Sequence, residues 1–201
     1  MAFERVMQIF AGSLVAAALT AAPQAVAAAE RFNIDQSHTN IVFLIDHLGY
    51  SKMIGQFQEF AGDFTFDPED LSRNEVAVTI KTSSVDTDHE KRDEHLRSPD
   101  FFNSAEFPDM TFVSTGVEKT GDNTGKLTGD LTLLGVTKPV TLDVTFNKMA
   151  PHPIPFYKGV LVAGFSARGS IKRSDFGMTY GTPVDWDAVT LWIEAEGHKA
   201  E

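Results

Sequence analysis

Alternation of apolar and polar residues at every second position runs through much of this 201-residue chain. In residues 76–80, valine and isoleucine alternate with alanine and threonine, and in residues 140–146 apolar side chains alternate with Thr141, Asp143 and Thr145. A period of two places successive side chains on opposite faces of an extended strand. The pattern therefore predicts antiparallel β-structure with one buried face and one solvated face.

The same alternation recurs in short segments separated by turn residues, which is typical of an all-β domain. The segments cover residues 32–35, 41–47, 54–66, 76–81, 110–117, 126–134, 140–146, 160–171 and 189–196. Because connections are short and closure removes exposed strand edges, we expect an antiparallel barrel of about eight strands. A two-sheet sandwich is the alternative. No linker-like stretch interrupts the pattern, so residues 30–201 are expected to form one domain.

A short charged stretch interrupts the strand pattern. Thr87 and Glu90 stand in capping-box spacing, and Ser98-Pro99 ends the helical pattern because proline restricts the residue before it. We therefore expect a short helix over residues 88–97. A helix inserted into a β-barrel is usually a lid or a plug, and we expect Ser98-Pro99 to be the hinge of such a gate.

The N-terminal segment predicts export from the cytoplasm. Residues 9–22 form an apolar run that is short for a membrane span, and small-x-small cleavage sites follow within residues 25–29. We expect residues 1–29 to be a cleaved signal peptide, with an uncleaved anchor as the alternative because Glu4 offsets Arg5. The protein is then periplasmic if its host is a Gram-negative bacterium.

Charge and composition exclude several classes of function. Acidic residues number 28 against 17 basic residues, giving a formal net charge of -11. This balance disfavours nucleic acids and anionic membrane surfaces as partners, because both require a basic face. The chain has no cysteine, so disulfides, thiolate metal sites and cysteine nucleophiles are excluded. His38 and His47 do not have the spacing of a zinc motif, and we expect neither a metal ion nor a cofactor.

Phenylalanine dominates the aromatic residues. The chain holds 16 phenylalanines against 3 tyrosines and 2 tryptophans. Phenylalanine adds apolar area without a polar group that needs a partner. A barrel of about eight strands is at the size where side chains either fill the interior or leave room for one ligand. Composition leaves both possibilities open.

A series of short motifs runs in a fixed order from residue 32 to the C-terminus. The motifs are Asp35-x-Ser37-His38-Thr39, Gly55-x-Phe57, Phe60-x-Gly62, Ser83-x-Val85-Asp86-Thr87, Arg92-Asp93-x-His95-Leu96, Phe107-Pro108-x-x-Thr111-Phe112, Gly129-Asp130-Leu131-Thr132, Gly135-Val136-Thr137-Lys138-Pro139 and Arg173-Ser174-Asp175-Phe176-Gly177-Met178. By these motifs the chain resembles the YceI-like family of exported, lipocalin-like polyisoprenoid-binding proteins. The resemblance implies an elongated antiparallel barrel with a helix near its mouth. It also implies an isoprenoid or other long-chain amphiphile inside, and often a homodimer.

We expect apolar side chains inside the barrel to bind the tail of such a ligand. Each methylene group moved from water to an apolar wall contributes about 0.8 kcal/mol, so the tail should set the affinity. The alternative for each residue is an ordinary place in the core. The candidate tail-binding residues are Phe43, Ile45, Phe57, Phe60, Phe101, Phe102, Phe112, Leu131, Phe165, Phe176 and Trp192.

Four polar side chains are candidates for binding the head group: Arg92, His95, Lys138 and Arg173. Arginine can bind a phosphate or carboxylate in a fork, lysine supplies a point charge, and neutral histidine can donate to a quinone carbonyl. The alternative for the two arginines is an ion pair with the nearby Asp93 or Asp175. We also expect the motif of residues 173–178 to form a turn or bulge in which Gly177 adopts unusual backbone angles.

These observations favour a non-catalytic function. The expected protein binds, sequesters or transports a quinone-like or prenyl phosphate lipid in the periplasm, with a membrane-bound donor or acceptor as a further partner. One alternative is a stress or partner-interaction protein with a filled barrel. Another is an isoprenoid-modifying enzyme that uses Asp86, Asp93 and His95 as acid and base. The sequence has no nucleophile elbow, phosphate loop or metal motif that would favour an enzyme.

Overall fold

The computed structural model describes residues 29–181 and 186–201. Within these residues the strands are β1 (Glu30–Ile34), β2 (Asn40–His47), β3 (Ser51–Phe57), β4 (Phe60–Phe66), β5 (Glu75–Lys81), β6 (Val85–Asp86), β7 (Asp109–Lys119), β8 (Thr124–Leu133), β9 (Val136–Pro151), β10 (Leu161–Lys172) and β11 (Ala188–Lys199). The helices are α1 (Glu90–Arg97) and four 3₁₀ turns, η1 (Leu71–Arg73), η2 (Thr82–Ser84), η3 (Pro155–Tyr157) and η4 (Arg173–Phe176). Residues 1–28 of the predicted signal peptide lie outside the described residues. None of the described helices has the length and apolar character needed to cross a membrane.

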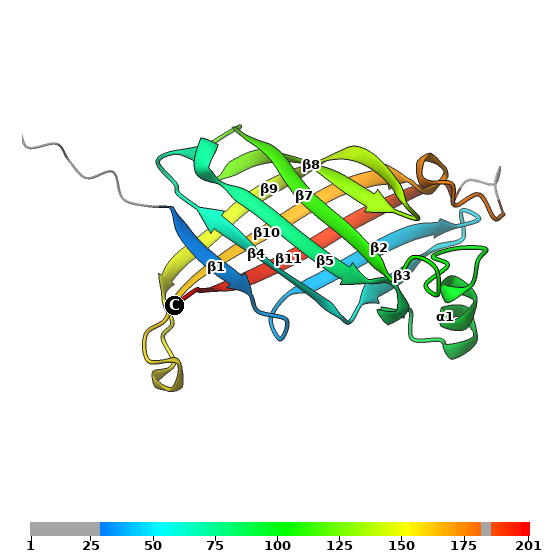
Figure 1. Cartoon of the computed structure of the whole chain (residues 1–201), viewed down its shortest axis with the longest axis horizontal. Coiled ribbons are helices and arrows are strands. Elements are labelled where there is room, and N and C mark those ends of the chain that lie inside the picture. Colours follow the sequence, from blue (N-terminus) through cyan, green and yellow to red (C-terminus); the bar gives the residue numbers. More distant parts are fainter. Residues whose placement is uncertain (1–28, 182–185) are drawn as a thin grey trace, which may run out of the picture.

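The strands form a closed antiparallel barrel (Figure 1). The sheet order is β1-β4-β5-β7-β8-β9-β10-β11-β2-β3-β6, and β1 also pairs with β11. β11 pairs with β10 along one edge, and with β2 and then β1 along the other. β1 and β2 therefore act as one interrupted strand, as do β3 and β4, so that eight long strands follow one another around the barrel. The predicted barrel is confirmed, and the sandwich alternative is wrong.

Side-chain alternation in the strands explains which face is buried. On β5, Val76, Val78 and Ile80 point into the barrel, whereas the alternating positions Ala77 and Thr79 are exposed. This is the face that the period of two predicts for a half-buried strand. The alternation in the sequence therefore identifies which residues of this strand form the inner wall of the barrel.

Helix α1 lies at one end of the barrel, and the start of β1 and the C-terminus lie at the other (Figure 1). The helix agrees with the prediction over residues 88–97, but the predicted capping box is wrong. His89 is the N-cap, and its Nδ1 accepts a hydrogen bond from the backbone N–H of Arg92. Thr87 instead donates to the buried Asp93, from both its backbone N–H and its hydroxyl. The Thr87 hydroxyl is therefore bonded to a side chain of the helix itself and does not cap its N-terminus.

Two apolar clusters occupy the interior. The larger one includes Phe57 of β3 and Phe102 of the segment that follows α1. The rings of these two residues meet edge to face with centroids 5.4 Å apart. The smaller one lies toward the far end, where Phe32 is fully buried and stacks on Phe64 with centroids 5.0 Å apart. We call this second set the far-end cluster. It consists of Phe32, Phe64, Phe66, Phe146 and Phe165.

Candidate functional site

The barrel encloses a cavity of about 690 Å³. Its wall consists largely of inward-facing apolar side chains, including Val78 on β5, Leu142 and Val144 on β9, and Leu191 on β11. Ligand-binding cavities of proteins commonly measure about 300–1,000 Å³ and are mostly apolar with a few polar groups. The size and the lining of this cavity therefore suit one apolar or amphipathic molecule.

Most of the predicted tail-binding residues line this cavity. They are Phe43, Ile45, Phe57, Phe101, Phe102, Phe112, Leu131 and Phe165. They come from β2, β3, β7, β8, β10 and the segment after α1, and closure of the barrel turns them toward one another. That these side chains contact a ligand stays a prediction, because lining a cavity is a property of the empty protein as well.

Three predicted tail-binding residues lie elsewhere. Phe60 and Phe176 are 4% and 2% exposed and belong to the larger core cluster without lining the cavity. Trp192 is 44% exposed on the outer face of β11, beneath the guanidinium of Arg168, and its Nε1 donates to Glu194. The prediction for Trp192 conflicts with this position. The alternation of β11 agrees with this outward position, because Val189, Leu191, Ile193 and Ala195 line the cavity whereas Trp192 shares its face with Thr190 and Glu194.

Arg173 is the most buried charged group at the helix end of the cavity. It begins η4, its side chain lines the cavity, and the residue is 2% exposed. Its guanidinium donates to three backbone carbonyls: those of Trp186 at 3.1 Å, Met178 at 3.2 Å and Tyr180 at 2.6 Å. Arg173 therefore holds three residues of the segment between η4 and β11 in place.

The charge of Arg173 is poorly compensated. Among the described residues it forms no ion pair, and burial lowers the pKa of its guanidinium while the more distant Asp187 opposes this effect. Arginine nevertheless remains protonated in proteins. A desolvated cation surrounded by carbonyls favours an anion or a strong dipole nearby. Arg173 thus supplies a positive potential at this end of a largely apolar cavity.

The predicted turn around Arg173 is confirmed. Gly177 is the C-cap of η4, and its φ of 83° is a left-handed conformation that glycine adopts readily. The backbone N–H and hydroxyl of Ser174 both donate to the carboxylate of Asp187, at 2.9 and 2.8 Å. These two hydrogen bonds, with the backbone N–H bond first, lower the pKa of Asp187. They fasten η4 to the beginning of β11.

Trp186 is a polar group of the cavity that sequence analysis missed. Its side chain lines the cavity, and its indole Nε1 is buried without a hydrogen-bond partner among the described residues. An unsatisfied buried donor costs about 1–3 kcal/mol. Its backbone carbonyl accepts from Arg173, so the two side chains belong to the same local structure. The indole N–H is a donor available to an oxygen atom of a ligand.

Arg92 and His95 also line the cavity from α1. Arg92 donates from Nε to the hydroxyl of Thr87 and from its terminal nitrogen to the Thr87 carbonyl, both at 2.6 Å. His95 Nε2 lies 2.9 Å from a carboxylate oxygen of Asp100, and its ring meets Tyr180 edge to face at 5.0 Å. The helix therefore contributes polar groups whose positions are set by contacts within residues 87–101 and, for His95, by the ring of Tyr180.

The remaining head-group candidate and the alternative ion pairs are not part of this arrangement. Lys138 is exposed near the turn between β8 and β9 and does not line the cavity. Neither Arg92 with Asp93 nor Arg173 with Asp175 forms an ion pair in the described part of the chain. Both arginines do fasten neighbouring segments, but through hydroxyl and carbonyl oxygens. No local sequence signal marks Trp186 or Tyr180, because the loop geometry alone brings them to Arg173.

Comparisons with known proteins agree with the geometry. A profile described as the YceI-like domain matches residues 32–197. Protein YceI of Salmonella arizonae is 45% identical over 186 residues, covering 92% of this chain and 95% of that protein. The crystal structure of the Campylobacter jejuni YceI protein is 37% identical with a TM-score of 0.69, covering 78% of this chain and 90% of that one. A polyisoprenoid binding domain from Saccharophagus degradans, 13% identical, has a TM-score of 0.63 with coverage of 84% and 98%. It shares the fold.

Proposed function

Because the chain belongs to the YceI-like family, we propose that its barrel binds a polyisoprenoid or a similarly long amphiphile, with the tail in the cavity and the head group beside Arg173 and Trp186. The observation that carries this proposal is the pairing of an apolar cavity of about 690 Å³ with a buried guanidinium and an unsatisfied indole N–H at one end. The Saccharophagus degradans domain, named for polyisoprenoid binding, supports the ligand class.

The tail supplies most of the binding free energy in this proposal. Several isoprene units contribute more than one head-group hydrogen bond, since each buried methylene is worth about 0.8 kcal/mol and a net hydrogen bond about 1 kcal/mol. An apolar wall also tolerates different chain lengths. We therefore expect affinity to rise with chain length until the cavity is filled.

The head group supplies orientation and selectivity. A quinone carbonyl can accept from the indole N–H of Trp186, and a prenyl phosphate can in addition bind near the desolvated charge of Arg173. A hydrocarbon of the same length satisfies neither group. The proposed specificity is therefore for oxygen-bearing chains over plain hydrocarbons, with quinone-like and prenyl phosphate lipids as the two head-group classes.

The proposed role is that of a carrier in the periplasm. The apolar run at residues 9–22, followed by small residues, supports export, and a ligand enclosed in a barrel can pass between a membrane-bound donor and acceptor. The cavity disfavours the alternative of a filled barrel. In the enzyme alternative Asp93 would act as an acid or base, but it is buried and already accepts two hydrogen bonds from Thr87, which disfavours that role. The proposed carrier returns its ligand chemically unchanged.

Purification from the native host, native mass spectrometry and extraction of the bound molecule test the ligand class. We expect one isoprenoid-type lipid for each barrel. A barrel that is empty on isolation, and that also takes up neither quinones nor prenyl phosphates in vitro, would contradict the proposal. Recovery of a chemically altered lipid would instead favour the enzyme.

A matched pair of tryptophan variants tests the head-group site. Trp186→Phe keeps an aromatic ring in the cavity but removes the N–H, whereas Trp192→Phe removes the same group from the outer surface. Loss of one net hydrogen bond of about 1 kcal/mol predicts roughly fivefold weaker binding of a quinone for Trp186→Phe. Trp192→Phe should bind as the wild type does. Equal affinities for both variants would place the head group elsewhere.

A further inference from the structure

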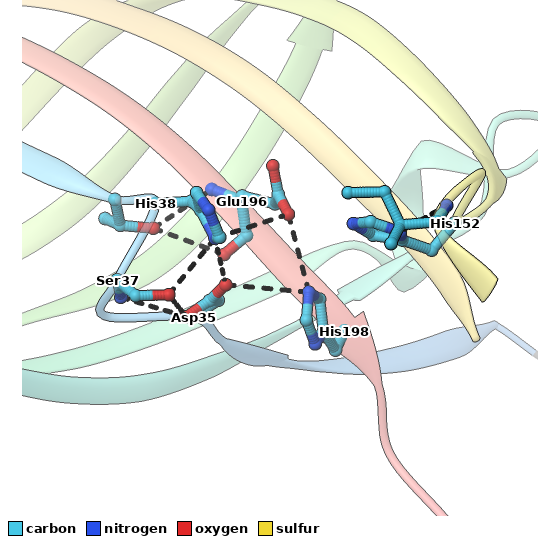
Figure 2. Close-up of polar contacts among 8 residues, drawn as sticks. Asp35, Ser37, His38, His152, Glu196 and His198 are labelled. Carbon is cyan, nitrogen blue, oxygen red and sulfur yellow. Dashed lines mark hydrogen bonds and ion pairs between the residues drawn. The ribbon is translucent and has the colours of Figure 1, made fainter. Parts of the chain in front are cut away.

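A second group of polar side chains lies on the outside of the barrel, where the first and last strands meet. Figure 2 shows Asp35 and His38, from the segment between β1 and β2, beside Glu196 and His198 of β11. We call these four residues the seam cluster. None of them lines the cavity, so the cluster is separate from the proposed lipid site.

Backbone pairing brings the four side chains together. β1 pairs with the end of β11, where Asn33 lies opposite His198, and β2 pairs with its earlier part, where Asn40 lies opposite Glu194. Between these ladders the backbone N–H of Asp35 donates to the Glu196 carbonyl at 2.9 Å. Because Glu196 and His198 are two positions apart on a strand, both side chains lie on the same face of β11, which is the face opposite to its cavity-lining residues.

The donor atoms converge at separations that suit metal ligands. Oε1 of Glu196 lies 3.4 Å from Nε2 of His198, and Oδ2 of Asp35 lies 3.6 Å from the same nitrogen. These separations are long for hydrogen bonds, which are typically about 2.7–3.2 Å. They are close to the distance of about 3.3 Å between neighbouring ligands of a tetrahedral zinc ion bound at about 2.0–2.1 Å.

His38 can supply a fourth ligand. Its Nδ1 lies 2.6 Å from Oδ2 of Asp35 and 4.0 Å from Oε1 of Glu196. A small movement toward Glu196 would bring both separations near the tetrahedral value. Ser37 donates to the other carboxylate oxygen, Oδ1 of Asp35, from its backbone N–H at 2.9 Å and its hydroxyl at 2.7 Å. These two hydrogen bonds to Oδ1 hold Oδ2 toward the cluster.

We propose that the seam cluster binds a divalent cation of the zinc class through Asp35, Glu196 and His198, with His38 as the fourth ligand. Two imidazoles and two carboxylates form a nitrogen and oxygen donor set that zinc accepts. Two ionised carboxylates also give the neutral-histidine form of the cluster a negative charge. Among the described residues, Asp35, Glu196 and His198 are the group whose donors satisfy a common distance limit for one ion.

The competing interpretation is a hydrogen-bonded ion pair without a metal. Partial burial acts to raise the pKa of Asp35, but the hydrogen bond from His38 and the two from Ser37 lower it to about 2. The same hydrogen bond to Asp35 raises the pKa of His38. A bound cation has to displace the proton that these two residues share, so binding should release protons and should be measured near pH 8.

A metal at this position would clamp the closing seam of the barrel. Its ligands come from the beginning and the end of the domain, so the ion would join two segments that are distant in the sequence. Ligands that bind only the folded state raise its stability by mass action. The clamp should therefore raise the melting temperature without changing the cavity, which is formed by the opposite faces of the strands.

Titration of the tag-free, metal-stripped protein with Zn²⁺ tests the proposal. Calorimetry, combined with competition against a chromophoric chelator, should show one ion per chain and a higher melting temperature. Glu196→Gln and His198→Gln should each weaken binding by more than about tenfold, since each removes a ligand. Co²⁺ should give the visible absorption bands of a four-coordinate ion, and these bands should be lost in both variants.

His89→Asn is the matched control. It removes an imidazole from the opposite end of the barrel and leaves a residue type that also caps helices well. We expect its Zn²⁺ affinity to equal that of the wild type. Zn²⁺ binding that is unaffected by Glu196→Gln and His198→Gln, or no binding at micromolar Zn²⁺ by the folded wild-type protein, would overturn the proposal. If Glu196→Gln fails to fold, His38→Gln and His198→Gln measure the same loss from the other ligands.

Discussion

The end of the barrel beside α1 holds buried polar groups against the cavity, whereas the far end is packed with phenylalanine rings. Arg173 and Trp186 belong to the first end, and Phe32, Phe64 and Phe165 to the second. The far end also lines the cavity with polar residues such as Lys119 and Asn123, but these are exposed, whereas the Arg173 side chain and the unpartnered indole nitrogen of Trp186 are buried among the described residues. The difference gives the interior a polarity that can orient an amphiphile. It also predicts that changes at the two ends have different consequences.

The largest expected effect is on stability, at the far end. Phe32→Ala removes a fully buried ring that stacks on Phe64, and should lower the free energy of unfolding by about 3–5 kcal/mol. Phe156→Ala, at a residue that is 83% exposed, should change it by less than about 0.5 kcal/mol. Urea unfolding followed by circular dichroism measures both. Similar midpoints for the two variants would contradict the assignment of the far-end cluster as a structural core.

Arg173 should combine stability with specificity. Arg173→Lys keeps the charge, but an ammonium cannot reach three carbonyls that a planar guanidinium reaches together. We expect Arg173→Lys to lower the free energy of unfolding by about 2 kcal/mol. We also expect it to reduce the affinity for prenyl phosphate more than the affinity for a plain prenyl chain. The control is Arg168→Lys on the outer surface, where a charge pair with Glu194 is worth at most about 1 kcal/mol. Prenyl phosphate affinity that is equal for both variants would remove Arg173 from the head-group site.

Gly55 tests the size of the cavity with little expected change in stability. A Cβ at this position would lie 2.2 Å from Cζ of Phe43, so Gly55→Ala should push that ring into the cavity. We expect weaker binding of the longest prenyl chains and little change for short ones, with a stability loss of about 1 kcal/mol, the low end for overpacking, because the ring can move into the cavity. Gly116→Ala, where nothing lies within 4 Å of the added Cβ, is the matched control. An unchanged dependence of affinity on chain length would show that Phe43 does not limit the ligand.

The smallest expected effect is on pH dependence at the helix end. The folded-state pKa of Asp187 lies below its ordinary value of 3.8, so its bonds to Ser174 contribute stability above pH 3.8 that is lost as the pH falls through the folded pKa. The difference in stability between the wild type and Asp187→Asn should therefore be constant near neutral pH and shrink on acidification below this value. Urea midpoints measured between pH 6 and the acid limit provide the test. A difference that grew on acidification would have the wrong sign for this carboxylate.

The helix insertion shows how far local sequence reasoning reaches. The capping-box spacing of Thr87 and Glu90 and the stop at Ser98-Pro99 predict a helix over residues 88–97, and α1 occupies residues 90–97. His89 rather than Thr87 is the cap, because the Thr87 hydroxyl instead donates to Asp93 and accepts from Arg92. Spacing along the chain identifies potential caps, but competition among neighbouring side chains selects one of them.

The candidate site was predictable to a similar extent. Alternation identified inward-facing residues such as Phe43 and Phe112, because a strand has only two faces. The prediction for Trp192 went against the alternation, because this residue shares a strand face with Thr190 and Glu194 while Leu191 and Ile193 line the cavity. Alternation gave no indication of Trp186, whose importance depends on a missing hydrogen-bond partner rather than on its position in a pattern.

By itself, the sequence determined the β-class of this protein, the place of its helix and most of the apolar wall, because these follow from periodicity and from local stereochemistry. Only the tertiary structure decided the contacts that join distant segments. Closure of the barrel brings Asp35 to Glu196 and His198, and the folding of η4 against β11 surrounds the guanidinium of Arg173 with carbonyls. Such clusters depend on the register between strands, which hydrogen bonding across the whole sheet sets and which no single segment encodes.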